Sequence, residues 1–127
     1  MKQVSHVTEA EHKIMKVLWR KNPISAIEIT KDLYSTTGWK PNTVQTLLSR
    51  LVKKKILSFR KEGKSYLYFS LVSKEKFTSE AGKSFLHHFF DGTVFSMTAH
   101  FIENEKLTDK EINSLKKMLN NRKRKNK

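Results

Sequence analysis

The fold is decided by residues 39–57, WKPNTVQTLLSRLVKKKIL, which have the pattern of an amphipathic helix. The apolar residues recur at spacings of three and four, which indicates one buried helix face; they are Val44, Leu47, Leu48 and Leu51. Pro41 suits the first helical position, because its fixed φ and missing N–H cost nothing there. We therefore expect a helix from Pro41 to about Lys54.

The opposite face of this helix is polar, and no acidic residue occurs from Gly38 to Arg60. Solvated helix faces usually carry Glu and Lys, which form helices better than Thr, Ser or Asn. Here the face is made of Asn42, Thr43, Gln45, Thr46, Ser49, Arg50 and Lys53, and Lys40 directly precedes it. Such a face suits base edges in a DNA major groove. A solvated, Thr-rich helix would give the same short pattern.

The composition favours a polyanionic partner. The 127 residues hold 26 Lys and Arg against 12 Asp and Glu, a formal net charge of +14, which attracts polyanions strongly. Cysteine is absent, so disulfides, thiolate metal sites and a cysteine nucleophile are excluded. No apolar run approaches the ~18 residues that a membrane span needs, and no signal peptide is evident. We expect a cytoplasmic protein without membrane insertion.

The charge is unevenly spread, which suggests how the domains are arranged. Residues 1–72 hold 14 Lys and Arg against 5 Asp and Glu, whereas residues 73–121 hold seven of each. The last six residues, RKRKNK, are strongly basic. We predict a DNA-binding domain over residues 1–72, a helical dimerisation domain over 73–121 and a disordered basic tail over 122–127.

Two helices are expected before the polar helix. The pairs Thr8–Glu11 and Ser25–Glu28 have the spacing of capping boxes, which open helices, and Pro23 separates them. We place these helices at residues 8–20 and from Ser25 to about residue 34, with a turn at 36–38. Three short helices ending in a basic polar one indicate a helix-turn-helix arrangement.

A β-hairpin follows the polar helix. Residues 56–72, ILSFRKEGKSYLYFSLV, alternate in the manner of strands around a turn at Glu62-Gly63-Lys64, where Gly supplies a positive φ. The fold class is therefore mostly α with a small hairpin, a winged helix-turn-helix. Its basic residues Arg60, Lys61 and Lys64 would lie on phosphates. Tyr66 and Tyr68 are typical of cross-strand packing, or would stack on bases if the partner were single-stranded RNA.

The remaining chain predicts three further helices, at residues 74–90, at 93–103 and from a third capping box, Thr108–Glu111, onward. These short segments are too rich in Phe and Leu to bury their apolar faces alone. We expect a homodimer, whose two recognition helices would meet the half-sites of a palindromic operator ~34–36 Å apart.

Two segments resemble the penicillinase-repressor family of bacteria, the BlaI/MecI type. They are EAEHKIMKVLW (residues 9–19) and TVQTLLSRLVKKKIL (43–57), followed by the hairpin that ends at Leu71. The resemblance implies a dimeric winged-helix repressor of genes for β-lactamase or a resistance penicillin-binding protein. It also implies that Thr43, Thr46 and Arg50 face DNA. Gln45 stands where members are often basic, and Gln reads adenine N6 and N7. Lys55 stands where some members have Gly as the helix stop.

The resemblance also implies how repression ends. In the β-lactam systems a membrane sensor with a zinc peptidase domain is linked to cleavage of an Asn–Phe bond in the C-terminal part, which corresponds here to His100–Phe101. Phe101 is equally explained as an aromatic of a core or interface. A ligand or partner bound at the dimer interface is another route to derepression. The related copper repressors use a cysteine motif, which this chain lacks.

No pattern of an enzyme or a metal site is present. His87 and His88 are adjacent on a helix, so they point in different directions, and neither H-E-x-x-H nor a carboxylate pair suited to acid–base work occurs. We expect no catalysis, metal or cofactor. The main alternative to a DNA-binding repressor is a basic RNA-binding or ribosome-associated module.

Overall fold

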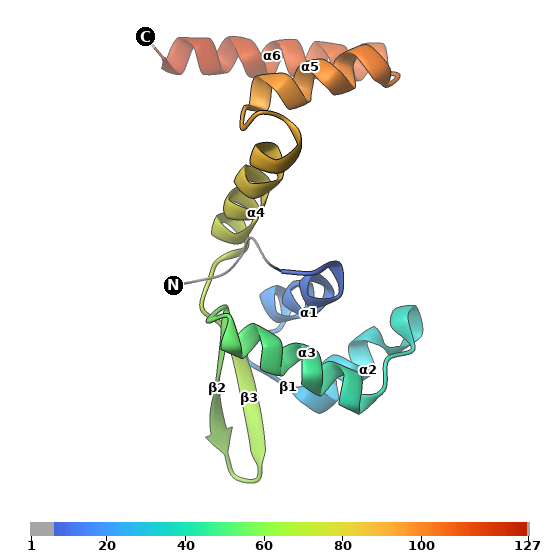
Figure 1. Cartoon of the computed structure of the whole chain (residues 1–127), viewed down its shortest axis with the longest axis vertical. Helices are drawn as coiled ribbons and strands as arrows, with labels where there is room; N and C mark the ends of the chain where they lie inside the picture. The colour runs from blue at the N-terminus through green and yellow to red at the C-terminus, as the bar shows by residue number, and fades with distance from the viewer. Residues whose placement is uncertain (1–6, 127) are drawn as a thin grey trace. The chain divides into compact units, whose positions relative to one another are not determined.

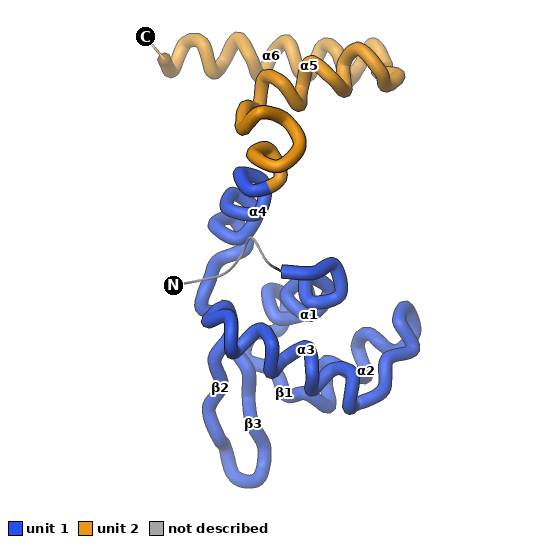
Figure 2. Tube along the Cα trace, in the orientation of Figure 1, with its two compact units in different colours: residues 1–84 blue, residues 85–127 orange. Residues whose placement is uncertain are grey.

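The computed structural model describes residues 7–126. Six helices and three short strands follow one another (Figure 1), and they are α1 (Glu9–Arg20), β1 (Ile24–Ser25), α2 (Ala26–Thr37), α3 (Pro41–Lys53), β2 (Leu57–Glu62), β3 (Ser65–Ser70), α4 (Lys74–Phe89), α5 (Val94–Asn104) and α6 (Asp109–Lys125). The chain divides into two compact units, residues 1–84 (unit 1) and residues 85–127 (unit 2) (Figure 2). The predicted class, mostly α with a small hairpin, is confirmed.

The predicted capping residues begin the helices of unit 1. The Thr8 hydroxyl accepts from the Glu11 N–H at 3.1 Å, and the Glu11 carboxylate accepts from the Thr8 N–H at 2.9 Å, which is a complete capping box. The Ser25 hydroxyl likewise accepts from the Glu28 N–H at 3.3 Å. These bonds satisfy N–H groups that have no partner within the helix.

The turn predicted at residues 36–38 is wrong in part, because α2 continues to Thr37. The Thr36 and Thr37 hydroxyls both donate to the Leu33 carbonyl, at 3.2 and 2.7 Å, within the last turn of the helix. Gly38 then ends the helix with a φ of +67°, a conformation that glycine adopts without strain.

The hydrogen bonds at the C-terminus of α3 explain the left-handed backbone conformation of Lys55. The Ile56 N–H donates to the Leu51 carbonyl at 3.1 Å, and the Lys55 N–H donates to the Val52 carbonyl at 2.9 Å. This pair of bonds is a Schellman motif, in which the residue after the cap is left-handed. Lys55 has a φ of +63°, so a lysine occupies a position that favours glycine.

The hairpin is part of a three-stranded antiparallel sheet in the order β1-β3-β2. Glu62 pairs with Ser65, so the turn consists only of Gly63, with a φ of +61°, and Lys64. The third strand, β1, pairs Ile24 with Tyr68. The sequence analysis did not predict β1, because two residues are too short to show alternation.

One hydrophobic core lies between the helices and the sheet of unit 1. Its most deeply buried apolar side chains are Ile14, Met15, Val17, Leu18, Ile24, Ile29, Val44, Leu48, Leu51, Ile56 and Leu57. Phe77 of α4 also belongs to this core, and its ring centroid lies 5.1 Å from that of Trp19. Unit 1 therefore extends into α4, beyond the boundary expected after residue 72.

Unit 2 contains much exposed apolar surface. Neither α5 nor α6 has a buried residue. The helix α6 begins at the predicted capping box of Thr108 and continues to Lys125, so residues 122–125, expected in a disordered tail, are helical in the structure. Lys and Arg form helices well, and their charges are favourable at a helix C-terminus. Among residues 7–126, no helix is both long and apolar enough to cross a membrane.

Candidate nucleic-acid interface

The polar face of α3 is exposed along its length. The opposite face buries Val44, Leu47, Leu48 and Leu51 in the core, as the spacing predicts. Six of the predicted DNA contacts line one shallow depression of about 430 Å3, and these are Asn42, Gln45, Thr46, Ser49, Arg50 and Lys53. The structure thus brings six of the predicted residues together on one surface that contains no carboxylate.

The other predicted residues of this region lie at the start of the helix. Lys40 is the N-cap residue of α3, and its carbonyl accepts from the Thr43 N–H at 3.0 Å. The side chains of Lys40 and Thr43 are both exposed, and neither lines the depression. The Thr46 hydroxyl donates to the Asn42 carbonyl at 3.0 Å, which leaves its oxygen lone pairs and its methyl group for a partner.

A hydrogen bond joins α3 to the sheet. Nε2 of Gln45 donates to the hydroxyl oxygen of Tyr68 at 3.1 Å. Beside this bond lies a pocket of about 440 Å3, lined by Gln45, Ser49, Val52, Phe59, Tyr66 and Tyr68. Sequence reasoning assigned Tyr68 to strand packing, or to stacking on RNA bases, and missed this contact, because nothing in a local pattern relates two residues 23 positions apart.

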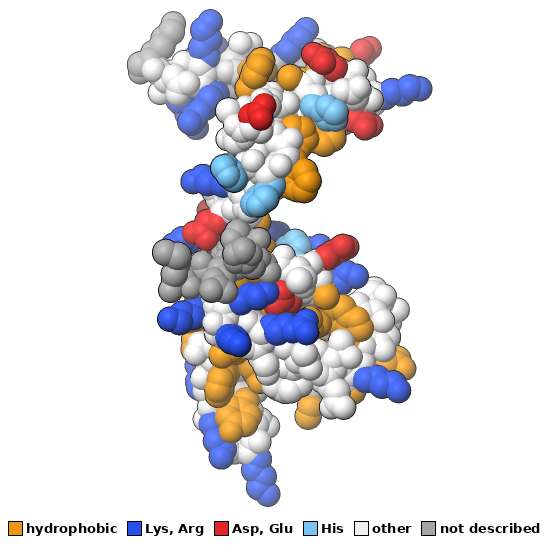
Figure 3. Space-filling view, in the orientation of Figure 1, with side chains coloured by type: hydrophobic (Ala, Val, Ile, Leu, Met, Phe, Trp, Pro, Cys, Tyr) orange, Lys and Arg blue, Asp and Glu red, His pale blue; other side chains and the backbone are white. Residues whose placement is uncertain are grey.

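The tip of the hairpin is basic. Arg60, Lys61 and Lys64 are all exposed, and Lys and Arg side chains cover the end of the hairpin in the space-filling view (Figure 3). Arg60 pairs with Glu62 at 3.0 Å, an exposed contact that contributes little to stability. The hairpin therefore exposes Lys61 and Lys64 to solvent and holds Arg60 beside a carboxylate.

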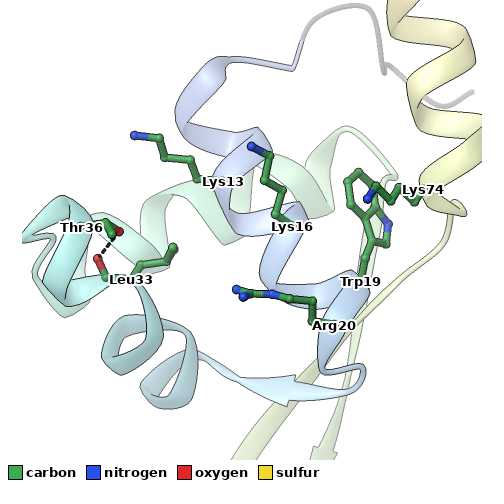
Figure 4. A pocket seen from close by; sticks show the side chains of 7 residues that line it. All are labelled: Lys13, Lys16, Trp19, Arg20, Leu33, Thr36 and Lys74. Atoms are coloured by element: carbon green, nitrogen blue, oxygen red, sulfur yellow. Dashed lines mark hydrogen bonds between the residues drawn. The ribbon is translucent and has the colours of Figure 1, made fainter. Parts of the chain in front are cut away.

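Positive charge also surrounds a depression lined by α1, α2 and the first residue of α4 (Figure 4). This depression of about 470 Å3 is lined by Lys13, Lys16, Trp19, Arg20, Leu33, Thr36 and Lys74, without an acidic residue. Burial lowers the pKa of His12, and the charges of Lys16 and Lys74 lower it further. The positive potential of unit 1 is therefore not confined to α3 and the hairpin.

The proposed cleavage bond lies in the other unit. His100 and Phe101 are both exposed residues of α5, and the His100 carbonyl accepts from the Asn104 side chain at 2.7 Å. The Phe101 ring contacts that of Phe90, with centroids 5.7 Å apart. Within residues 7–126, no three His, Asp or Glu side chains are grouped closely enough to hold a metal ion.

The chain matches known proteins over nearly its full length. The family model described as penicillinase repressor matches residues 7–121. The penicillinase repressor of Bacillus licheniformis is 37% identical over 127 residues, which are 100% of this chain and 99% of that protein. The methicillin resistance regulatory protein MecI of Staphylococcus aureus (strain N315) is 32% identical over 114 residues, 90% of this chain and 93% of MecI.

Solved structures match the winged-helix part. The solution structure of the DNA binding domain of the repressor BlaI is 38% identical, has a TM-score of 0.53, and covers 58% of this chain and 90% of that domain. The monomeric form of Bacillus licheniformis BlaI in complex with the blaP half-operator is 37% identical, with a TM-score of 0.51 and coverages of 59% and 92%. The winged-helix prediction is confirmed, and the chain belongs to the penicillinase repressor family.

Proposed function

We propose that this protein is a dimeric, sequence-specific DNA-binding repressor that acts in the cytoplasm on genes of β-lactam resistance. The observation that carries this proposal is the acid-free polar face of α3, where six predicted contacts line one surface. The monomeric form of Bacillus licheniformis BlaI, which is similar to this chain, is solved in complex with a half-operator, which supports operator DNA as the partner. The names of the relatives, penicillinase repressor and methicillin resistance regulatory protein, support the class of regulated genes.

In this proposal α3 enters the major groove and the hairpin lies along the backbone. Asn42, Gln45 and Arg50 carry the donors and acceptors that read base edges. Lys61 and Lys64, at the exposed tip of the hairpin, neutralise phosphates and add affinity for any sequence. Base contacts give selectivity and phosphate contacts give affinity, so the two groups of residues have separable effects.

The apolar surface of unit 2 is the proposed dimer interface. Phe95 is 81% exposed and Leu119 is 67% exposed, although large apolar side chains are usually covered when they cluster on one unit. A second copy of the chain would cover them and would place two copies of α3 on a palindromic operator. Half-sites would then be ~34–36 Å apart.

Release of repression is proposed to follow cleavage between His100 and Phe101 by a membrane sensor peptidase. The support is the correspondence of this bond with the Asn–Phe bond of the family. Cleavage would remove α6 from the chain while all of unit 1 stays covalently intact.

The experiment that tests the function is a footprint on the DNA upstream of this protein's own gene, at ~150 mM salt with random DNA as competitor. Two protected half-sites one turn apart are expected. Arg50→Ala and Thr46→Ala should lose preference for this site over random DNA by roughly 5- to 100-fold. If Arg50→Ala binds the upstream site and random DNA with the same affinities as the wild type, the assignment of α3 as the DNA-reading helix is wrong.

The hairpin lysines provide the contrasting result. Lys61→Gln and Lys64→Gln should weaken binding to all DNA alike, and each should reduce the slope of log affinity against log salt by about 1. Lys110→Gln, an exposed lysine on α6, is the matched control and should leave the slope unchanged.

RNA binding is the second candidate function. Its supporting observation is that Phe59 and Tyr66 are each 46% exposed, with ring centroids 5.4 Å apart, because exposed aromatic rings stack on unpaired bases. In this case single-stranded RNA would compete for the protein better than duplex operator DNA does. Phe59→Ser together with Tyr66→Ser would remove RNA binding and leave duplex binding in place.

A further inference from the structure

Tyr68 holds its hydroxyl group in a fixed position next to α3. Its side chain is only 7% exposed and belongs to the hydrophobic core of unit 1, and its strand β3 pairs with both β1 and β2. Its ring lies 5.8 Å from that of Phe59 between centroids. The core and the sheet therefore position the oxygen that accepts, at 3.1 Å, the hydrogen bond from Nε2 of the exposed residue Gln45.

We propose that Tyr68 is a positioning residue for base recognition, which orients the Gln45 carboxamide to read one adenine in each half-site. This inference rests on the proposed function, in which α3 lies in the major groove. Tyr68 itself touches no base in this scheme. It acts through Gln45, and it links the sheet of the winged helix to the selectivity of the recognition helix.

The chemistry of the carboxamide gives the choice of base. Gln has two N–H donors and one carbonyl acceptor. With one N–H bonded to Tyr68, the second N–H and Oε1 remain for the DNA. One donor beside one acceptor complements N7 and N6 of adenine in the major groove. The reversed carboxamide would turn Oε1 to Tyr68 and two donors to the DNA, which complements N7 and O6 of guanine. The contact with Tyr68 is made through Nε2, and this orientation predicts adenine.

The hydrogen bond to Tyr68 orders the Gln45 side chain before DNA binds. An exposed glutamine side chain ordinarily loses its rotational freedom only when it binds. Here part of that ordering is already present in the free protein, which favours binding in the preorganised orientation.

The test is selection of bound sequences from a pool of operator variants with randomised half-sites, using the full-length protein. Four variants are compared with the wild type, and these are Gln45→Ala, Tyr68→Phe, Tyr66→Phe and the double variant of Gln45→Ala with Tyr68→Phe. Tyr66→Phe is the matched control, because it removes a hydroxyl from the same strand at a residue that is 46% exposed. Thermal melting verifies that each variant is folded.

The wild type should select adenine at one position of each half-site. Gln45→Ala should lose that preference by roughly tenfold or more, the discrimination typical of a bidentate contact. Tyr68→Phe should weaken the preference at the same position and at no other, and the double variant should resemble Gln45→Ala. Tyr66→Phe should select the wild-type sequence.

Gln45→Glu provides an independent measurement that leaves the buried ring untouched. A carboxylate accepts from the Tyr68 hydroxyl and offers only acceptors to the DNA, so the selected base should change from adenine to cytosine, whose N4 donates. The inference is overturned if Tyr68→Phe keeps the full wild-type preference, or alters positions that Gln45→Ala leaves alone. If the wild type selects no sequence at all, the proposed function itself fails.

Discussion

The carboxylate of Glu11, near the start of α1, binds the ammonium group of Lys54 at the end of α3, with Nζ 2.7 Å from Oε1 and 3.0 Å from Oε2. Glu11 is fully buried. Burial alone would raise its pKa, but the hydrogen bonds from Lys54 and from the N–H and hydroxyl of Thr8 outweigh burial, and its pKa is lowered. One carboxylate thus caps α1 and also binds the C-terminal end of α3.

Removal of the cation should destabilise unit 1. Lys54→Met would leave a buried carboxylate without its cation, and such a loss typically costs about 3–5 kcal/mol; the retained bonds to Thr8 favour the lower end. Thermal unfolding at pH 7 measures the effect. Arg20→Met, which breaks an exposed pair with Asp32, should cost less than about 1 kcal/mol. If the two substitutions lowered the free energy of unfolding equally, burial of the Glu11–Lys54 pair would not account for its contribution to stability.

The same pair predicts a pH dependence. Because the pKa of Glu11 is lower in the folded protein, the unfolded chain binds its proton first as the pH falls. The stabilisation is complete above the ordinary pKa of Glu, about 4.3, and is lost as the pH falls through the folded value. The stability difference between wild type and Lys54→Met should therefore shrink below about pH 4.

The left-handed position of Lys55 predicts a stabilising substitution. Lys55→Gly relieves the steric penalty of a φ of +63°, partly offset by the greater freedom of glycine in the unfolded chain, for a net gain of roughly 0.5–1 kcal/mol. Denaturant unfolding measures it. Gly38→Ala, at a φ of +67°, is the opposite control and should lose about 1 kcal/mol. A lower midpoint for Lys55→Gly would contradict this account of the Schellman motif.

The proposed dimer interface predicts that two equally exposed aliphatic side chains differ in their effect on self-association. Leu119 on α6 and Ile27 on α2 are each 67% exposed. Leu119→Ser should weaken self-association about tenfold or more in analytical ultracentrifugation, because it removes apolar surface that a second copy would cover. Ile27→Ser should not affect it. Unchanged association for Leu119→Ser would place the interface elsewhere.

The cleavage proposal predicts an effect at His100. In cells that contain the sensor peptidase, exposure to a β-lactam should give a fragment that ends at residue 100, identified by mass spectrometry. His100→Asn recreates the Asn–Phe pair of the family at an exposed position, so the fragment should accumulate faster. His87→Asn, also exposed, is the control. A fragment with another end would show that this bond is not the target.

Much of the fold was predictable because its signals are local. The capping box at Thr8, the apolar spacing around Leu48 and the turn at Gly63 each lie within a few residues. The bonds of Glu11 with Lys54 and of Gln45 with Tyr68 were missed, because 43 and 23 residues separate their partners. The helix extends to Lys125 despite the positive charge of this segment, because Lys and Arg have a good helix propensity.

The burial of Phe77 has a consequence for what remains after a cut in α5. A fragment ending at residue 100 retains every core residue of unit 1, including Phe77, and so would keep its recognition surface. What it would lose is the linkage of two such surfaces, whose effective concentration at the second half-site is far above that of separate molecules. Induction would then operate by abolishing avidity. Each fragment would bind its half-site alone and would dissociate from the operator, although the residues that read the DNA stay intact.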